Sequence, residues 1–261
     1  MHDETVTVFE NRKVNARYFK ISFRSKRLAS GVEPGQFVQI KVREGWDPFL
    51  RRPFSYYRVQ GERIEILYEI LGRGSELLSK LAKGDRLQVM GPLGRGFSRE
   101  IRGKKRILVG GGVGVPPLVF LAERYGCDRF YIGTKSRHEV MPLGEIRKFH
   151  SRVFHTTQDG SYGVKGLVTG PLETWFKKDD FDPEAYFIQT CGPTRMMERV
   201  MEIASHFGVE GEASWEERMA CGVGVCLGCM VWTHYGWTCS CTEGPVFQFE
   251  ETPPRETGMV K

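Results

Sequence analysis

Five of the seven cysteines in this 261-residue chain fall between positions 221 and 241. In a chain expected to be cytosolic, such crowding is typical of metal ligation rather than of disulfides. Cys221, Cys226 and Cys229 follow the C-x4-C-x2-C spacing of plant-type [2Fe–2S] sites, which take a fourth, more distant cysteine. The segment from about residue 211 is too short for a core of its own, so a cluster must organise it.

Two cysteines are candidates for the fourth ligand. Cys241 begins the run Cys-Thr-Glu-Gly-Pro-Val-Phe, whose Gly-Pro turn would fix the return of the ligand loop, and we therefore favour it over Cys239. A structural zinc site is the alternative, but zinc knuckles usually come as two C-x2-C pairs and only one is present. A Rieske site needs two histidines, and this segment holds only His234.

In the rest of the chain, the pattern of expected secondary structure changes once. Residues 5–90 contain six short strand-like runs, 6–14, 16–25, 35–42, 53–59, 63–71 and 86–92, which predict a six-stranded antiparallel barrel with one helix over 75–84. From residue 101, strands at 106–112, 128–136, 152–160 and 185–193 alternate with helices at 115–126 and 194–208, which predicts a parallel α/β sheet. We expect a barrel domain over 1–100, an α/β domain over 101–210 and a cluster segment over 211–261.

Charge divides the chain as well. Residues 1–106 hold 23 Lys and Arg against 12 Asp and Glu, whereas the remainder holds 15 against 20. The arginines are spread over strand-like sequence without a basic helix, so anionic cofactor phosphates explain the basic half better than nucleic acid does. No stretch approaches the ~18 apolar residues of a membrane span. We expect a cytoplasmic protein without membrane contact.

The run Arg51-Arg52-Pro53-Phe54-Ser55-Tyr56 is a candidate flavin site. Alternating positions would offer a charge for a pyrophosphate, an aromatic face for the isoalloxazine and a hydroxyl for a hydrogen bond. The alternative is an ordinary half-buried strand, which would show the same residue pattern. Glycines entering the helix at Gly72-Arg73-Gly74-Ser75 would make a second anion site. Two phosphate sites in one small barrel indicate a dinucleotide such as FAD.

A glycine-rich turn follows the strand at 106–112. Gly111, Gly112 and Gly114 lie in the run Val109–Pro117, between a buried strand and a helix, where glycines allow a pyrophosphate to approach the backbone. A tight structural turn is the alternative. The triplet Cys191-Gly192-Pro193 follows another strand, at the carboxyl edge where open α/β sheets bind ligands, and becomes a candidate for a nicotinamide pocket.

The ordered set of these pieces resembles a known family. A barrel, then RPFS, GPLGRGF (91–97), GGGVGVPP, DGSYGVKG (159–166), CGP and a C-terminal C-x4-C-x2-C…C-x2-GPVF are similar to the electron-transfer subunits of NAD-dependent dihydroorotate dehydrogenase, in the ferredoxin–NADP reductase superfamily. The resemblance covers essentially the whole chain.

The resemblance implies roles for particular residues. The FAD contacts would be Arg52, Pro53, Phe54, Ser55, Leu67, Tyr68, Glu69, Gly74 and Ser75, and the cluster ligands Cys221, Cys226, Cys229 and Cys241. Two features depart from the family. Relatives typically carry arginine at the position of Glu69, and the interval between Cys229 and Cys241 is shorter than usual.

The resemblance also implies a function and a partner. An FMN-containing catalytic subunit would oxidise dihydroorotate during pyrimidine (UMP) biosynthesis, and electrons would cross the [2Fe–2S] cluster to FAD and NAD⁺ in a heterotetramer. Related subunits of a ferredoxin:NADP⁺ transhydrogenase or a sulfhydrogenase are the nearest alternative, and a cofactor-free zinc scaffold is a more distant one. The run Gly133–Arg137 lacks the acidic residue that would hold the ribose diol of NAD, so NAD is expected on family grounds alone.

The cluster segment also carries candidate docking residues. One side of it must pack on the flavin domain and the other must face the partner subunit, so apolar side chains without partners in the chain should form the docking patch. Val231, Trp232, Tyr235 and Trp237 are the candidates, and shielding of the cluster from water is the alternative role.

Overall fold

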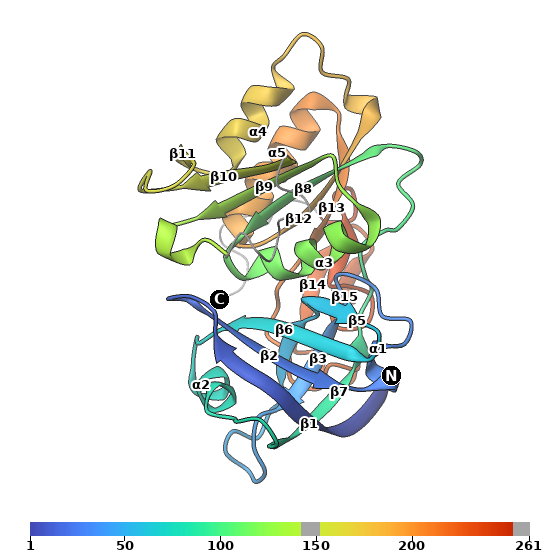
Figure 1. Cartoon of the computed structure of the whole chain (residues 1–261). Coiled ribbons are helices and arrows are strands. Elements are labelled where there is room, and N and C mark those ends of the chain that lie inside the picture. The colour runs from blue at the N-terminus through green and yellow to red at the C-terminus, as the bar shows by residue number, and fades with distance from the viewer. Residues whose placement is uncertain (142–151, 253–261) are drawn as a thin grey trace.

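The computed structural model describes residues 1–141 and 152–252, so the last part of the predicted cluster segment, 253–261, lies outside the described residues. Figure 1 shows an antiparallel sheet packed against an α/β layer, with the C-terminal segment running along both. No helix in the described part of the chain is long and apolar enough to cross a membrane.

The N-terminal sheet is antiparallel and has seven strands in the order β4-β3-β7-β1-β2-β6-β5. Its elements, with two short helices, are β1 (His2–Lys13), β2 (Tyr18–Arg24), α1 (Lys26–Ala29), β3 (Phe37–Lys41), β4 (Arg52–Ser55), β5 (Arg58–Gln60), β6 (Arg63–Glu69), α2 (Arg73–Ser79) and β7 (Arg86–Leu93). Where one face of a strand covers the core, buried side chains alternate with more exposed ones, as they do along the whole of β7. The sheet curls around one core as a half-barrel.

Two expectations for this part differ in detail. The run 53–59 forms two strands, because the fully buried Tyr56 and Tyr57 separate β4 from β5 and place them at opposite edges of the sheet. The Tyr56 hydroxyl donates to the carbonyl of Leu28, 2.9 Å away, which fixes this break. The helix expected over 75–84 begins and ends earlier: it ends at Ser79, and the N–H of its C-cap Lys80 donates to the carbonyls of Leu77 and Leu78.

The second sheet has the order β11-β10-β9-β8-β12-β13-β16, parallel except for β16. Its elements are β8 (Lys105–Gly111), η1 (Gly112–Gly114), α3 (Val115–Tyr125), β9 (Arg129–Thr134), η2 (Arg137–Glu139), β10 (Val153–Thr157), β11 (Val164–Lys165), α4 (Thr169–Phe176), η5 (Pro183–Ala185), β12 (Tyr186–Cys191), α5 (Thr194–Phe207), β13 (Glu210–Ser214) and β16 (Val246–Gln248). Helices α4 and α5 cover one face, and α3 fills the space toward the half-barrel (Figure 1). The predicted parallel α/β sheet is confirmed.

The C-terminal segment is tied to both domains. It contributes the hairpin β14 (Met230–Thr233) and β15 (Gly236–Cys239), and β16 pairs antiparallel with β13. Strand β13 crosses the boundary expected between 210 and 211, and the sequence analysis did not predict it as a strand. The division into 1–100, 101–210 and 211–261 therefore stays a proposal.

Candidate functional site

The loop that carries the first three cysteines is folded around their sulfurs. Gly222 and Gly224 adopt positive φ values of 74° and 78°, which other residues rarely reach. These turns aim backbone N–H groups at sulfur: Val223 and Cys226 donate to Cys221 Sγ at 3.4 Å each, Gly224 to Cys241 Sγ at 3.1 Å and Gly228 to Cys226 Sγ at 3.5 Å. Such donors stabilise thiolates that bind iron.

The N–H donors change the acidity of Cys221. Burial would raise the pKa of its thiol, but the backbone N–H groups of Val223 and Cys226 outweigh burial and lower the pKa to about 6. A thiol that ionises this readily suits a metal ligand.

The geometry supports Cys241 over Cys239 as the fourth ligand. Cys241 is buried in the same small core as Cys229, and its sulfur accepts from the Gly224 N–H. Cys239 is only half-buried, and its sulfur lies 3.3 Å from Met230 Sδ. In the described part of the chain no three His, Cys, Asp or Glu side chains converge as ligands of a single metal ion do. The ligand set thus rests on the burial and the N–H donors, and it remains a prediction.

Gln39 supplies an independent test of whether a cluster fits here. Its side chain is fully buried on β3, and neither amide atom has a hydrogen-bond partner in the described structure. A Cβ added to Gly222 would lie 3.1 Å from Gln39 Nε2, so this amide sits directly under the cysteine loop. A buried unpaired amide costs about 1–3 kcal/mol. A sulfur acceptor held by the loop would satisfy the Nε2 donor, and the residues present therefore fit an iron–sulfur cluster.

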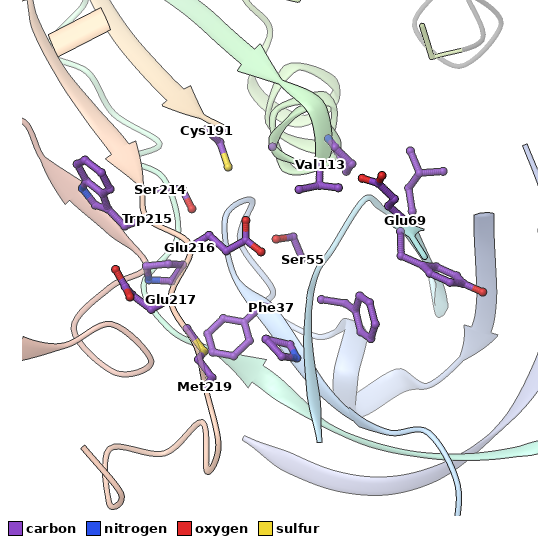
Figure 2. A pocket seen from close by; sticks show the side chains of 18 of the residues that line it. Phe37, Ser55, Glu69, Val113, Cys191, Ser214, Trp215, Glu216, Glu217 and Met219 are labelled. Atoms are coloured by element: carbon purple, nitrogen blue, oxygen red, sulfur yellow. The ribbon is translucent and has the colours of Figure 1, made fainter. Parts of the chain in front are cut away.

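A pocket opens next to this loop, between the half-barrel, the α/β domain and the C-terminal segment (Figure 2). The half-barrel contributes Phe37 from β3, one run from β4 and one run from β6. These runs contain six of the predicted flavin residues, namely Pro53, Phe54, Ser55, Leu67, Tyr68 and Glu69.

This pocket and the cysteine loop share a wall. Phe37 and Met219 line the pocket, and both also pack in the core that holds Cys229 and Cys241. A flavin in the pocket and a cluster in the loop would therefore be neighbours, separated by these two side chains.

Three predicted flavin residues lie away from this pocket. Arg52 packs on the start of α2, where a Cβ added to Gly74 would come within 2.7 Å of Arg52 Nε. The Ser75 hydroxyl accepts from the N–H groups of Leu71 at 2.9 Å and Gly72 at 3.3 Å, which closes the first turn of α2. The structure thus brings Arg52 and the Gly72–Ser75 turn together as one basic corner of the half-barrel.

The predicted nicotinamide residues meet at the carboxyl edge of the parallel sheet. Gly114, Cys191 and Gly192 line the pocket that also holds Pro53–Ser55, whereas Gly111, Gly112 and Pro193 line a second groove that runs past Thr134 and Lys135. The pocket and the groove adjoin at the turn Gly111–Gly114, so one dinucleotide can extend from the pocket across the ends of β8 and β9. Burial raises the pKa of Cys191 to about 12, so its thiol stays protonated.

Glu216 is a pocket residue that sequence reasoning missed as a functional group. It follows β13 directly, and Figure 2 shows it in the pocket near Ser55. Solvent in the open pocket reaches the carboxyl, yet protein surrounds it on most sides; this burial, followed by the charges of Glu217 and Glu69, raises its pKa. An acidic residue directly after a strand of the sheet was the available signal, but β13 itself was not predicted.

Comparisons with known proteins agree with this geometry. The model of the iron-sulfur cluster binding domain of dihydroorotate dehydrogenase B matches residues 216–252. The dihydroorotate dehydrogenase B (NAD(+)) electron transfer subunit of Clostridium acetobutylicum is 39% identical over 246 residues, which cover 92% of this chain and 93% of that protein. The subunit of the same name from Desulforamulus reducens is 37% identical over 239 residues, covering 88% and 90%.

Solved structures give the same fold. A chain from the structure of an NADH-dependent reduced ferredoxin-NADP oxidoreductase aligns with a TM-score of 0.83 at 27% identity, covering 95% of this chain and 90% of that chain. Phthalate dioxygenase reductase aligns with a TM-score of 0.66 at 18% identity, covering 89% and 87%, and is similar in fold.

Proposed function

Because the chain belongs to the family of dihydroorotate dehydrogenase B electron transfer subunits, we propose that it passes electrons from a catalytic partner subunit to NAD⁺ during pyrimidine biosynthesis. The observation that carries the proposal is the shared wall of Phe37 and Met219, which joins the cysteine loop to a pocket that opens on the glycine turn. A one-electron site and a hydride site would then lie side by side.

The pocket residues would hold and orient the cofactors. Pro53, Phe54 and Ser55 would face the isoalloxazine, with Leu67, Tyr68 and Glu69 beside them, while Arg52, Gly74 and Ser75 would hold the FAD phosphates. Gly111, Gly112, Gly114, Cys191, Gly192 and Pro193 would receive NAD(H), and Cys221, Cys226, Cys229 and Cys241 would bind the [2Fe–2S] cluster. When bound, the flavin supplies the exchange between a hydride and single electrons, while the protein supplies position and electrostatics.

Glu216 gives a prediction about the nicotinamide step. We expect Glu216→Gln to slow reduction of the bound FAD by NADH about tenfold, the effect of losing one hydrogen bond between the nicotinamide and a charged side chain. The pH profile of this rate should also lose the step that the raised pKa of Glu216 places above the ordinary carboxyl range. Stopped-flow absorbance measures both, and Glu250→Gln on the surface is the control.

Stability provides a second readout for the same variant. A carboxyl that holds its proton to higher pH when folded destabilises the protein as the pH rises through that range. Glu216→Gln should therefore raise the free energy of unfolding at neutral pH, and the gain should disappear below the unfolded pKa of about 4.3. If Glu216→Gln leaves both the pH profile of FAD reduction and the free energy of unfolding unchanged, Glu216 does not titrate as an acidic group of this pocket.

The partner is the finer part of the proposal: an FMN-containing dihydroorotate dehydrogenase subunit, assembled with this chain as a heterotetramer. The names of the relatives, which are electron transfer subunits, support a catalytic partner. Cys226, one of the proposed cluster ligands, is exposed on the cysteine loop, and its neighbours Val225 and Leu227 expose 79% and 60% of their surface. An exposed ligand flanked by exposed apolar side chains is suited to electron exchange with a docked protein.

The expected docking patch on the hairpin needs one correction. Val231 is only 3% exposed, because it points inward and packs with Trp215. Trp232, Tyr235 and Trp237 are 54%, 85% and 57% exposed. Residues of a strand alternate between faces, which separates Val231 from Trp232. We therefore keep the two tryptophans and Tyr235 as docking residues, together with Val225 and Leu227.

Assembly with the catalytic subunit tests these residues. Trp232→Ala, Trp237→Ala and the pair Val225→Glu/Leu227→Glu should each weaken co-purification at least tenfold, since exposed aromatic and apolar anchors carry much of an interface's affinity. Reduction of dyes by NADH through FAD should stay near normal. Trp46→Ala, which removes another exposed tryptophan, is the control. Full co-purification of all three variants would exclude this docking surface.

Co-expression with a dihydroorotate dehydrogenase catalytic subunit tests the function itself. The complex should reduce NAD⁺ when given dihydroorotate, and this chain alone should not. Reduction of NADP⁺ with ferredoxin, without any response to dihydroorotate, would instead favour the transhydrogenase alternative. That alternative fits the relatives less well, because curated subunits of the dihydroorotate enzyme reach 35–39% identity whereas the ferredoxin-NADP oxidoreductase chain reaches 27%.

A further inference from the structure

Arg17 reaches from the half-barrel into the α/β domain. It lies in the turn between β1 and β2, and its Nη1 donates to Glu139 Oε2 at 2.6 Å on the far side of the domain boundary. Its Nε lies 2.8 Å from Glu69 Oε2 at the end of β6. All three side chains are about one-fifth exposed, so this is a largely buried ion network between the domains.

The third guanidinium nitrogen is free to bind a ligand. Nη2 of Arg17 has no partner among the described residues, and it lies 3.4 Å from the position that a Cβ on Gly112 would occupy. Gly112 has a positive φ of 53° and begins the turn that leads into α3. The cation is therefore held against the glycine turn by the two carboxylates, with one N–H edge facing it.

The surroundings of Arg17 favour an anion. Arg17 lines the second groove together with Gly111, Gly112, Lys135 and Arg195. Four cations line this groove, namely these three and Arg199, and the groove includes the first turn of α5, whose backbone N–H groups also attract negative charge. The contact with Glu69 is not well aligned, and it leaves Arg17 Nε and Glu69 Oε2 without a hydrogen-bond partner in spite of their closeness. Charge rather than hydrogen-bond geometry holds this pair.

We propose that Arg17 is a phosphate-binding residue for the nicotinamide dinucleotide, contributed by the half-barrel across the domain boundary. The proposal rests on the proposed function, since it takes NAD(H) as the ligand of the groove. A guanidinium is suited to this task because its planar N–H edges match phosphate oxygens. Glu69 and Glu139 keep Arg17 oriented and offset its charge when the dinucleotide is away.

This role also explains the departure at position 69. The register of β2 and β6 pairs Tyr18 with Glu69, so residue 17 directly neighbours the end of β6. The Glu69 carboxylate lies 2.8 Å from Arg17 Nε, so a cation lies at the end of β6 although residue 69 is acidic. This cation comes from the turn between β1 and β2. A dinucleotide held by Arg17 and the glycine turn would contact both domains at once.

Binding of ADP-ribose to the FAD- and cluster-loaded protein tests the proposal, because ADP-ribose carries the pyrophosphate but undergoes no redox reaction. By titration calorimetry, Arg17→Gln should weaken ADP-ribose binding about tenfold, and Arg17→Lys should recover part of the loss. Lys13→Gln, which removes an exposed cation at the end of β1, should bind as the wild type does. FAD content, read from the absorption spectrum, should be equal in all four proteins.

The outcomes separate the possible roles of Arg17. If Arg17→Gln binds ADP-ribose as tightly as the wild type, Arg17 only joins the domains and the proposal is wrong, whatever happens to the melting temperature. If the wild type itself binds neither ADP-ribose nor NADH, the proposed function fails and this inference fails with it. A selective loss of ADP-ribose affinity in Arg17→Gln supports the proposal.

Discussion

Cys241→Ser should remove the iron–sulfur centre, whereas Cys239→Ser should leave it in place. The reason is local: Cys241 is fully buried and its sulfur accepts from the Gly224 N–H, whereas Cys239 is half-buried at the edge of the same core and its sulfur lies 3.3 Å from Met230 Sδ. Loss of a ligand from a segment without a core of its own should also destabilise the segment, because binding of the metal group and folding are coupled. Cys221→Ser, Cys226→Ser and Cys229→Ser should have the same effect.

Iron and sulfide analysis, together with the electron paramagnetic resonance spectrum of the reduced protein, measures this effect. The two substituted cysteines lie only two residues apart in the chain, so a general loss of folding would affect both variants. If the cluster survives Cys241→Ser and is lost in Cys239→Ser, the fourth ligand is Cys239.

Gly114→Ala should have the second largest effect. A Cβ on Gly114 would lie 2.3 Å from the carbonyl carbon and oxygen of Cys191, far inside van der Waals contact. The turn that follows β12 must then move away from the start of α3. We expect the free energy of unfolding to fall by about 1–3 kcal/mol, as for other overpacked sites. The rate at which NADH reduces FAD should fall at least tenfold, since the displaced residues line the pocket.

Gly170→Ala is the matched control for this prediction. Gly170 lies in α4 of the same domain, its φ is not positive, and an added Cβ would meet no atom within 4 Å. Gly170→Ala should therefore keep the wild-type rate and be at least as stable as the wild type, because alanine has a higher helix propensity than glycine. Equal NADH rates in the two variants would show that the close packing of Gly114 on Cys191 does not position the nicotinamide.

The sequence was informative where function depends on local spacing. Cys221, Cys226 and Cys229 lie within one loop, so their spacing alone indicated the cluster, and Gly114 lies in a strand–turn–helix unit that is recognisable from its residues. The strand alternation that buries Val231 and exposes Trp232 was also readable, but the hairpin was not assigned before the structure placed it.

Features that depend on distant contacts were not readable. Glu216 enters the pocket only because β13 joins the parallel sheet and β16 pairs with β13, and neither strand was among those expected from the sequence. Arg17 and Glu139 are separated by more than a hundred positions in the chain and meet only when the two domains pack together. The sequence around Gln39 indicates only a strand, and nothing in it shows that the cysteine loop covers this residue.

Anaerobic titration of the purified protein with NADH, followed by absorbance and electron paramagnetic resonance, tests the central claim most directly. The account predicts flavin bands that bleach as NADH is added, and a reduced [2Fe–2S] signal that grows in the same titration, because the pocket and the cysteine loop share the wall of Phe37 and Met219. Iron and FAD should be present in a ratio of two to one. A colourless protein containing zinc, or a cluster that stays oxidised in this titration while NADH reduces the flavin, would contradict it.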